Sequence, residues 1–310
     1  MKFVTFSTRE LPKPHLGLMR NEEILDVDLA GRALQLSVPD QMLVLIEQYA
    51  TYLPALQVIL QKTGKRRFTE VKTWNEIGAA HALDNVTLDA PIPYPRKNVL
   101  CVGLNYSEHI QEAASVRGHS GRLPEHPVFF TKPPTSVNRP GGEIVIDPAV
   151  STEIDWEAEL GVIIGKVGKN IREEDALSYV FGYTVLNDVT ARDLQSRHKQ
   201  FFKGKSLDGS CPMGPSIVTA DEIADPQALP VRLRVNGVTK QDGNTKQMLF
   251  SIARIIAVLS LGMTLEPGDI IATGTPSGVG FSRVPPEFLQ PGDVMETDIE
   301  GIGVLRNVVV

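Results

Sequence analysis

The stretch Asp155–Ile164, which reads DWEAELGVII, is the part of the sequence that decides the fold. Successive side chains of a β-strand point to opposite faces, so in a strand Glu157 and Glu159 lie on one face. Trp156, Leu160 and the other apolar side chains then cover the second face. Two neighbouring carboxylates in this arrangement fit either a strand face in contact with water or a site that binds a cation.

A third acid lies in a more apolar setting, within Phe181–Thr190 (FGYTVLNDVT). Asp188 occupies a run that is apolar on both faces, where a carboxylate is unfavourable unless it is paired or coordinates an ion. If Asp188 converges with Glu157 and Glu159, their oxygen atoms favour Mg²⁺, Mn²⁺ or Ca²⁺ over zinc. Sequence spacing leaves this convergence open.

The segment 105–112 (NYSEHIQE) predicts the start of a helix. His109 and Glu112 are three residues apart, so they share one helix face, and a hydrogen bond between them would make the imidazole a better proton acceptor. An exposed polar helix explains the same residues. The Gly-, Ser- and Arg-containing segment that follows, 116–126, is typical of a mobile lid.

A basic patch is predicted within 190–205, in a chain whose net charge is −6. It fits either an anionic small molecule or surface salt bridges. Its cations are Arg192, Arg197, Lys199, Lys203 and Lys205. The glycine-rich segment 272–280 lacks the lysine of a P-loop, and we expect it to present hydroxyl and N–H groups to a cleft.

Composition excludes several classes of protein. The 310 residues suggest about two domains. The acidic net charge argues against a nucleic-acid binder. Cys101 and Cys211 have no spacing typical of zinc sites or disulfide scaffolds. No apolar segment resembles a signal peptide or a membrane span, so we expect a cytoplasmic protein that binds neither nucleic acid nor membrane.

The chain divides at 88–97 (LDAPIPYPRK), where three alternating prolines favour extended backbone. Short alternating strands and then helices predict a small α+β domain over 1–92, and a second domain covers 97–310. In the second domain, strands do not alternate regularly with helices, which favours a β-rich α+β fold over a doubly wound parallel sheet. Strands are predicted over 98–102, 127–130, 143–146, 156–164, 181–189, 233–235, 269–272 and 294–299, and helices over 106–115, 173–180, 191–202 and 250–261.

Seven motifs occur together in the second domain. In order, they are N-Y-x-x-H-x-x-E at 105–112, F-x-K-P at 130–133, D-W-E-x-E-L at 155–160, N-D-x-T-A-R-D at 187–193, G-K-S-x-D at 204–208, C-P-x-G-P at 211–215 and T-G-T-P-S-G at 273–278. From about residue 97 onward, this ordered set resembles the fumarylacetoacetate hydrolase family. Within that family, the chain is most similar to bacterial members with a short N-terminal domain, several of which are acylpyruvate hydrolases or oxaloacetate decarboxylases.

The resemblance implies a mixed β-sheet roll, a homodimer and one divalent cation, Mg²⁺ or Mn²⁺, per subunit without an organic cofactor. It also implies a role for each of nine residues: Glu157, Glu159 and Asp188 as metal ligands, His109 and Glu112 as a general-base pair on a lid, Lys205 as the cation that stabilises developing negative charge, and Lys132, Gln195 and Thr275 as substrate contacts. Leu104 departs from the pattern, because some relatives carry a basic residue there that recognises the far carboxylate of the substrate.

These roles predict cleavage of a C–C bond in a small anionic 2-oxo acid. The metal would stabilise an enolate forming at C3. We expect hydrolysis of a 2,4-dioxo acid first, with His109 and Glu112 activating water. An oxaloacetate decarboxylase or a keto–enol isomerase would use the same site. A non-catalytic protein that binds a partner through residues 1–90 is the alternative from another class.

Overall fold

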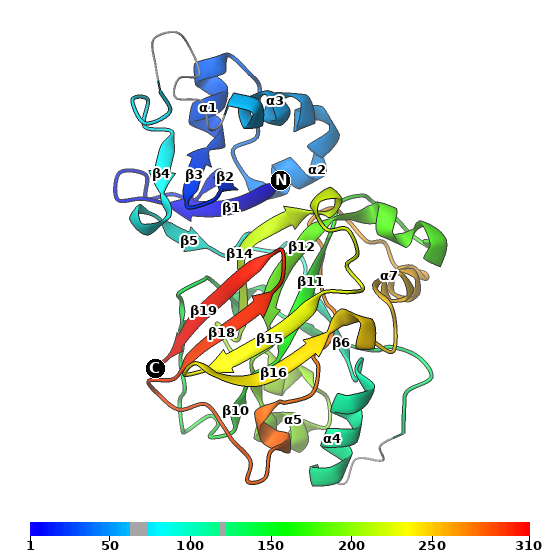
Figure 1. Cartoon of the computed structure of the whole chain (residues 1–310). Coiled ribbons are helices and arrows are strands. Elements are labelled where there is room, and N and C mark those ends of the chain that lie inside the picture. The colour runs from blue at the N-terminus through cyan, green and yellow to red at the C-terminus, as the bar shows by residue number, and fades with distance from the viewer. Residues whose placement is uncertain (63–72, 118–121) are drawn as a thin grey trace.

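The computed structural model describes residues 1–62, 73–117 and 122–310. Its described strands form a twelve-stranded mixed sheet, a five-stranded sheet and a two-stranded ladder, with few helices around them (Figure 1). This architecture confirms the predicted β-rich α+β class. The long sheet has the order β4-β3-β2-β1-β14-β12-β11-β17-β6-β7, with β5 beside β1 and β8 beside β14. The five-stranded sheet has the order β16-β15-β18-β19-β9, and β10 pairs with β13.

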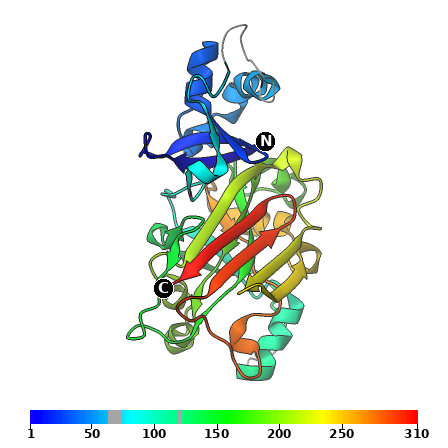
Figure 2. The ribbon, with the colours of Figure 1, turned by 60° about the vertical axis from the view of Figure 1, so that its left-hand side comes forward.

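The N-terminal unit consists of a meander followed by helices. Its elements are β1 (Lys2–Ser7), β2 (His15–Arg20), β3 (Glu23–Asp26), α1 (Val27–Leu34), α2 (Met42–Glu47), α3 (Tyr49–Lys62), β4 (Ala80–Ala82) and β5 (Thr87–Asp89). Asp26 ends β3 and also starts α1, because its side chain accepts a hydrogen bond from the N–H of Leu29. The unit stands at one end of the molecule (Figures 1 and 2).

The larger part contains the remaining strands. They are β6 (Val99–Gly103), β7 (Val128–Lys132), β8 (Val137–Asn138), β9 (Glu143–Ile144), β10 (Ile154–Asp155), β11 (Ala158–Ile164), β12 (Val180–Asn187), β13 (Thr190–Ala191), β14 (Cys211–Thr219), β15 (Pro230–Val235), β16 (Val238–Asn244), β17 (Ile270–Ala272), β18 (Val294–Ile299) and β19 (Gly303–Val309). Its helices are α4 (Ser107–Arg117), α5 (Arg192–His198), α6 (Phe202–Lys205) and α7 (Ile252–Ser260). None of the helices in the described ranges is long and apolar enough to cross a bilayer.

The main core lies between the two large sheets. Every residue of β11 and β12 is buried, because these strands have apolar side chains on both faces. The five-stranded sheet covers β11, β12 and β14, and Figure 2 shows β18 and β19 side by side on this outer layer. Side chains of both layers, such as Leu160, Val185, Leu233 and Leu305, belong to one buried apolar cluster.

The long sheet continues across the predicted domain boundary. β1 pairs antiparallel with β14, placing Phe3 opposite Ile217. A second apolar cluster contains residues from both sides, and the ring of Phe3 stacks on Phe181 with centroids 6.4 Å apart. The predicted division into 1–92 and 97–310 stays a prediction, and the structure adds that the two parts share a sheet and a core.

Several predicted elements differ in detail from those of the structure. The helix predicted over 173–180 is a 3-10 helix, η3 (Glu173–Tyr179). The helix predicted over 191–202 is divided into α5 and α6, because Lys199 has a φ of 60° and ends the first helix. Strands β14, β16 and β19 were not predicted. Of the predicted lid, residues 118–121 lie outside the described residues.

Candidate active site

Three acidic side chains meet at one end of β11 and β12. The antiparallel pairing of Ala158 with Asn187 brings Glu157 next to Asp188, and the N–H of Asp188 donates to the carbonyl of Glu157 at 2.8 Å. One carboxylate oxygen each from Glu157, Glu159 and Asp188 lies within 4.8 Å of the others. All three residues are buried. Their burial excludes a strand face in contact with water, and the arrangement suits a cation.

Three cations surround this acid cluster. Lys205 Nζ donates to Glu157 Oε2 at 2.7 Å and to Asp188 Oδ2 at 2.8 Å. Lys132 Nζ donates to Asp188 Oδ1 at 2.7 Å. Arg192 Nη2 lies 2.7 Å from Glu157 Oε1. Each contact is an ion pair shielded from water, so the acids Glu157 and Asp188 are compensated.

Arg192 also pairs with a fourth buried acid. Its Nε donates to Asp155 Oδ2 at 2.8 Å, and Asp155 has no exposed surface. Counting Asp155, four carboxylates and three cations lie in this region, so the net charge is −1 when all four acids are ionised. A divalent cation would change it to +1, and a dianionic ligand would then return it to −1. The charges therefore suit the joint binding of a cation and an anion.

The carboxylate that is left over is Glu159. Within the described residues, no lysine or arginine forms an ion pair with it, and its Oε2 accepts only the N–H of Gly274 at 2.7 Å. Burial and the neighbouring Asp188 and Glu157 raise the pKa of Glu159 well above its usual value. Burial also acts to raise the pKa of Glu157, but Lys205 and Arg192 outweigh it and lower that pKa to about 2. A bound cation would supply the charge that Glu159 lacks.

The segment 272–280 holds these acids through its backbone. The N–H of Gly274 donates to Glu159, that of Gly278 to Glu112 at 2.9 Å, and that of Gly280 to Asp155 at 2.7 Å. Gly274 and Gly278 have φ values of +98° and +100°, a conformation that favours glycine. We expected this segment to present its polar groups to a cleft. Instead, much of its backbone positions the carboxylates around the cleft.

His109 and Glu112 project from α4 on the other side of the site. His109 Nδ1 lies 3.9 Å from Glu112 Oε2, which is too long for a hydrogen bond. This nitrogen is buried and has no hydrogen-bond partner in the described part of the chain. Burial acts to raise the pKa of Glu112, but His109 and the N–H of Gly278 outweigh it, so the pKa is lowered. The ionised carboxylate therefore faces the imidazole without a direct hydrogen bond.

Asn105 explains where α4 begins. Its side-chain amide donates to the carbonyl of Thr273 at 2.8 Å and to that of Phe250 at 3.2 Å, and it accepts the N–H of Phe250 at 2.8 Å. The sequence predicted Asn105 or Ser107 as a helix cap. The structure instead uses Asn105 to join three segments that are distant in sequence, which fixes the helix carrying His109 beside the acid cluster.

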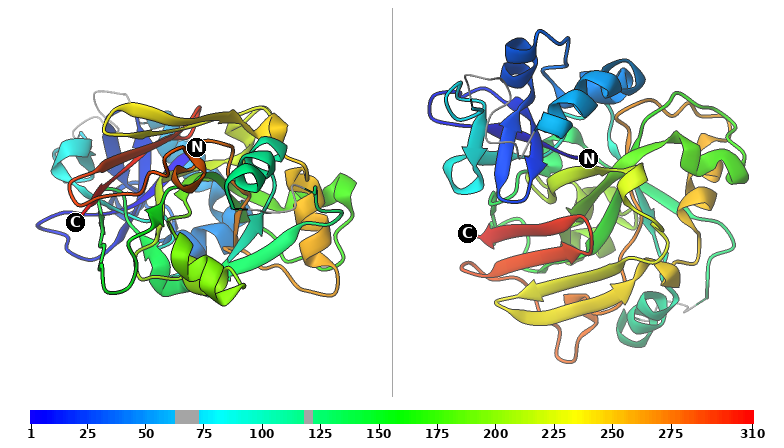
Figure 3. Two further views of the ribbon diagram at one scale, coloured as in Figure 1. Left: turned by 90° about the horizontal axis from the view of Figure 1, so that it is seen from below. Right: turned by 45° about the horizontal axis from the view of Figure 1, so that its top comes forward.

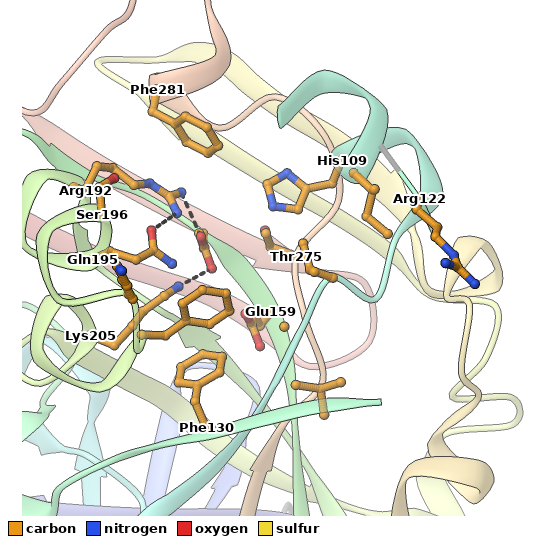
Figure 4. A pocket seen from close by; sticks show the side chains of 17 residues that line it. His109, Arg122, Phe130, Glu159, Arg192, Gln195, Ser196, Lys205, Thr275 and Phe281 are labelled. Carbon is orange, nitrogen blue, oxygen red and sulfur yellow. Dashed lines mark hydrogen bonds and ion pairs between the residues drawn. The ribbon is translucent and has the colours of Figure 1, made fainter. Parts of the chain in front are cut away.

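A cavity of about 550 Å³ connects these groups (Figure 4). Figure 4 shows Arg192, Gln195 and Lys205 on one side and His109 on the other, with Thr275 and Glu159 between them. The lining residues are Val102, Gly103, Leu104, His109, Ile110, Arg122, Phe130, Glu157, Glu159, Arg192, Gln195, Ser196, Lys199, Phe201, Lys205, Thr275 and Phe281. Six of the nine predicted site residues are therefore in its wall.

The other three predicted residues lie behind the wall. Glu112 faces His109 and Gly278, and Asp188 is held by Lys132 and Lys205. Lys132 has no exposed surface. Its predicted contact with substrate stays a prediction, and the structure gives it a different contact, namely the neutralisation of Asp188.

Arg192 and the aromatic rings in the wall were not predicted as site residues. Arg192 was noted only as part of the basic patch, although its place in the N-D-x-T-A-R-D motif could have indicated it. Aromatic rings complete the wall: the Arg192 guanidinium lies 4.3 Å from the centroid of Phe281, and Lys205 Nζ lies 5.2 Å from that of Phe130. These rings shield the inner cations from water, which strengthens their interactions with an anion.

The family model for the C-terminal domain of fumarylacetoacetate (FAA) hydrolase matches residues 98–310. The chain belongs to the fumarylacetoacetate hydrolase family. It is 51% identical over 234 residues to the oxaloacetate tautomerase YisK of Bacillus subtilis, covering 75% of this chain and 76% of that protein. It is 40% identical over 315 residues to the mitochondrial oxaloacetate tautomerase Fahd2a of Rattus norvegicus, covering 100% of this chain and 92% of that protein.

Solved structures of the family have the same fold. A maleylpyruvate hydrolase from Sphingobium, in complex with manganese(II) ion and pyruvate, is 31% identical to this chain, with a TM-score of 0.75. The match covers 100% of this chain and 99% of that one. The named relatives in this family are thus enzymes of 2-oxo acids, including tautomerases as well as hydrolases.

Proposed function

We propose that this protein is a keto–enol tautomerase of oxaloacetate that depends on a divalent cation. The observation that carries the proposal is the match, over the whole chain at 40% identity, to relatives named for this activity. From the sequence alone, hydrolysis of a 2,4-dioxo acid is the first expectation, and a keto–enol isomerase is one of the alternatives. The comparisons support that alternative more strongly than the first expectation.

The residues of the acid cluster suit Mg²⁺ or Mn²⁺. Glu157, Glu159 and Asp188 would hold the ion through oxygen atoms, the ligands these cations prefer. When bound, the ion would act as a Lewis acid toward the carboxylate and keto oxygens of a 2-oxo acid. The uncompensated charge of Glu159 supports this assignment.

Tautomerisation requires one proton to leave C3 and one to be added to the oxygen on C2. His109 lies in the cavity wall, and its imidazole can accept this proton and return it. Its Nδ1 is turned toward Glu112, so Nε2 is the nitrogen available to the substrate. Glu112 stabilises the imidazolium that forms when Nε2 takes the proton. Because C3 and the C2 oxygen are close together, the same nitrogen can return the proton.

Negative charge develops on the C2 oxygen when the proton leaves C3. Lys205 and Arg192 line the cavity with their charges fixed by buried acids, so they stabilise this charge without rearranging. Gln195 also lines the cavity, and its side-chain NH2 group can orient the carboxylate, whereas the hydroxyl of the neighbouring wall residue Thr275 already donates to the carbonyl of Ala158 at 2.9 Å. No C–C bond breaks in this reaction, and no attacking water has to be positioned.

The test follows the enol of oxaloacetate by its ultraviolet absorbance in the presence of Mg²⁺, while pyruvate is measured in parallel. We expect the protein to accelerate the decay of the enol without releasing pyruvate, and we expect chelation of the cation to abolish the acceleration. A decay rate equal to that of buffer with Mg²⁺ would refute the proposal.

Acylpyruvate hydrolysis is a second candidate, favoured by the maleylpyruvate hydrolase structure. The same assay with acetylpyruvate or fumarylpyruvate distinguishes the two. Pyruvate release from either compound, at a rate above that of oxaloacetate tautomerisation, would make hydrolysis the main activity. Pyruvate release from oxaloacetate itself would instead indicate the decarboxylase.

A further inference from the structure

One face of α5 follows the cavity from its interior to its mouth. Arg192, Gln195 and Ser196, at positions i, i+3 and i+4, lie on one side of α5, and Lys199 follows at the residue that ends the helix; all four line the cavity. Exposure increases along this row: Arg192 is buried, Gln195 is half-buried, and Ser196 and Lys199 are exposed. Figure 4 shows the first three on the side facing His109.

Lys199 is the last member of this row, and its charge forms no ion pair within residues 1–62, 73–117 and 122–310. Of the cations that line the cavity, Lys205 and Arg192 are paired with the inner acids, and Arg122 Nη2 lies 3.3 Å from Glu125. No ion pair of Lys199 with any residue in the described part of the chain is present. Lys199 also ends α5 with a φ of 60°, which places it at the turn between α5 and α6.

The charge of the site calls for one further cation when the ligand is a dianion. The inner acids and cations sum to −1, a divalent ion adds +2 and oxaloacetate adds −2, which leaves −1. The keto acid end of the substrate belongs beside the inner cations, so its second carboxylate extends toward the mouth. Lys199 would supply a positive charge at that point.

We propose that Lys199 binds the second carboxylate of the substrate and thereby selects dicarboxylic over monocarboxylic 2-oxo acids. This inference rests on the proposed function, because it assigns the far end of the same substrate. It makes Lys199 a specificity residue: it contributes to binding, while the proton transfer at C3 depends on His109.

The experiment compares oxaloacetate with its 4-methyl ester, which keeps the reacting atoms but lacks the second charge. Lys199→Gln is measured beside Lys199→Arg and the control Lys203→Gln. Lys203 is an exposed lysine of α6 and is not in the cavity wall. For Lys199→Gln we expect the KM for oxaloacetate to rise about tenfold with little change in kcat, the loss typical of one charge-assisted hydrogen bond. The ester should be turned over equally by both proteins.

Lys199→Arg should retain most of the affinity for oxaloacetate, and Lys203→Gln should behave like the wild type. Equal losses with both substrates in Lys199→Gln, or no loss with either, would overturn the assignment. The role of Lys199 can also be tested independently of turnover. Calorimetry measures how tightly oxaloacetate and its ester bind to the Mg²⁺-loaded wild type and variants. If the wild type binds oxaloacetate without converting it, the tautomerase proposal fails, while the binding difference still decides the role of Lys199.

Discussion

At the scale of single residues, Glu159 differs from the neighbouring acids in its ion pairing. Glu157, Asp188 and Asp155 are each paired with a buried lysine or arginine, whereas no such pair within the described residues reaches Glu159. An uncompensated buried carboxylate destabilises a fold, and the penalty is relieved by a proton or by a cation. At this residue, the requirements of stability and of metal binding therefore oppose each other.

Glu159→Gln tests this opposition. We expect turnover with Mg²⁺ to fall at least about 100-fold, because a ligand of the cation is lost. Measured in a chelator, the free energy of unfolding should stay equal or rise, because the cost of burying Glu159, which the metal-free protein meets by protonating it, is removed. Urea denaturation and the enol assay provide the two readings, with the exposed Glu300→Gln as the control. A loss of more than about 2 kcal/mol in the metal-free protein would contradict the expectation.

The raised pKa of Glu159 also predicts how cation binding depends on pH. Without a cation, Glu159 holds a proton at pH values where an ordinary glutamate is ionised, so the cation must displace this proton. The affinity for Mg²⁺ should therefore increase as the pH rises toward the raised pKa, and proton uptake by the buffer should accompany binding. Calorimetry in two buffers with different ionisation enthalpies measures the released protons. An affinity independent of pH would show that Glu159 is already ionised.

Replacing Arg192 should lower the free energy of unfolding, whereas replacing Glu159 should not. Arg192→Met leaves Asp155 and Glu157 buried without this partner, so we expect a loss of about 3–5 kcal/mol in the free energy of unfolding. Arg232→Met is the matched control, because Arg232 pairs with Asp242 on the surface and should cost less than about 1 kcal/mol. Equal losses in the two variants would show that the buried pairs contribute no more than an exposed one.

At the scale of elements, the strand β14 shows a limit of sequence analysis. Its sequence, CPMGPSIVT, contains two prolines, which argue against a central strand because proline cannot donate to the ladder. The structure nevertheless places β14 between β1 and β12, with a cis Gly214–Pro215 bond and a shifted register in the pairing with β12. The local sequence favours a turn, and pairing with distant strands on both sides overrides it.

The residue types of the site could be predicted from the motifs, but their pairing could not. Local strand geometry predicts that Glu157 and Glu159 lie close together, and they do so although Glu157 comes just before β11 begins. The contact of Lys132 with Asp188 joins β7 to the end of β12, and these strands lie far apart in the sheet order. The break between α5 and α6, which places Lys199 at the cavity mouth, likewise depends on one backbone angle that the helical pattern does not encode.

The helix α4 gives a prediction at the element scale, because Glu112 has two contacts. It accepts the N–H of Gly278 and faces His109. Glu112→Gln keeps an acceptor for Gly278 but loses the charge, so kcat should fall about 100-fold with the melting temperature unchanged. Glu112→Ala loses both contacts and should lower kcat and the melting temperature together. If Glu112→Gln retains full kcat, the charge of Glu112 does not assist His109.

At the scale of the whole molecule, the two parts of the chain are joined more closely than the proline-rich boundary suggests. The proline-rich boundary at 88–97 is visible in the local sequence. The pairing of β1 with β14 and the shared apolar cluster join residues that are distant in the chain, so neither the sequence of β1 nor that of β14 indicates them. The N-terminal strands lie at one end of the long sheet and α4 and α5 at the other, where the cavity is (Figures 1 and 3). Within the described residues, the N-terminal unit is connected to the site by this sheet and by the shared apolar cluster, against which the wall residue Phe130 packs.

This arrangement predicts that the chain unfolds as one cooperative unit. Phe3 has no exposed surface and stacks on Phe181 across the boundary, so Phe3→Ala should cost about 3–5 kcal/mol. Tyr94→Ala, which removes an aromatic ring that is 82% exposed, should have little effect. In Phe3→Ala, hydrogen exchange should accelerate in β12 and β14 as well as in β1, and calorimetry should show a single transition at a lower temperature. Two separate transitions, with exchange in β12 unchanged, would show instead that the N-terminal unit unfolds independently of the part that carries the active site.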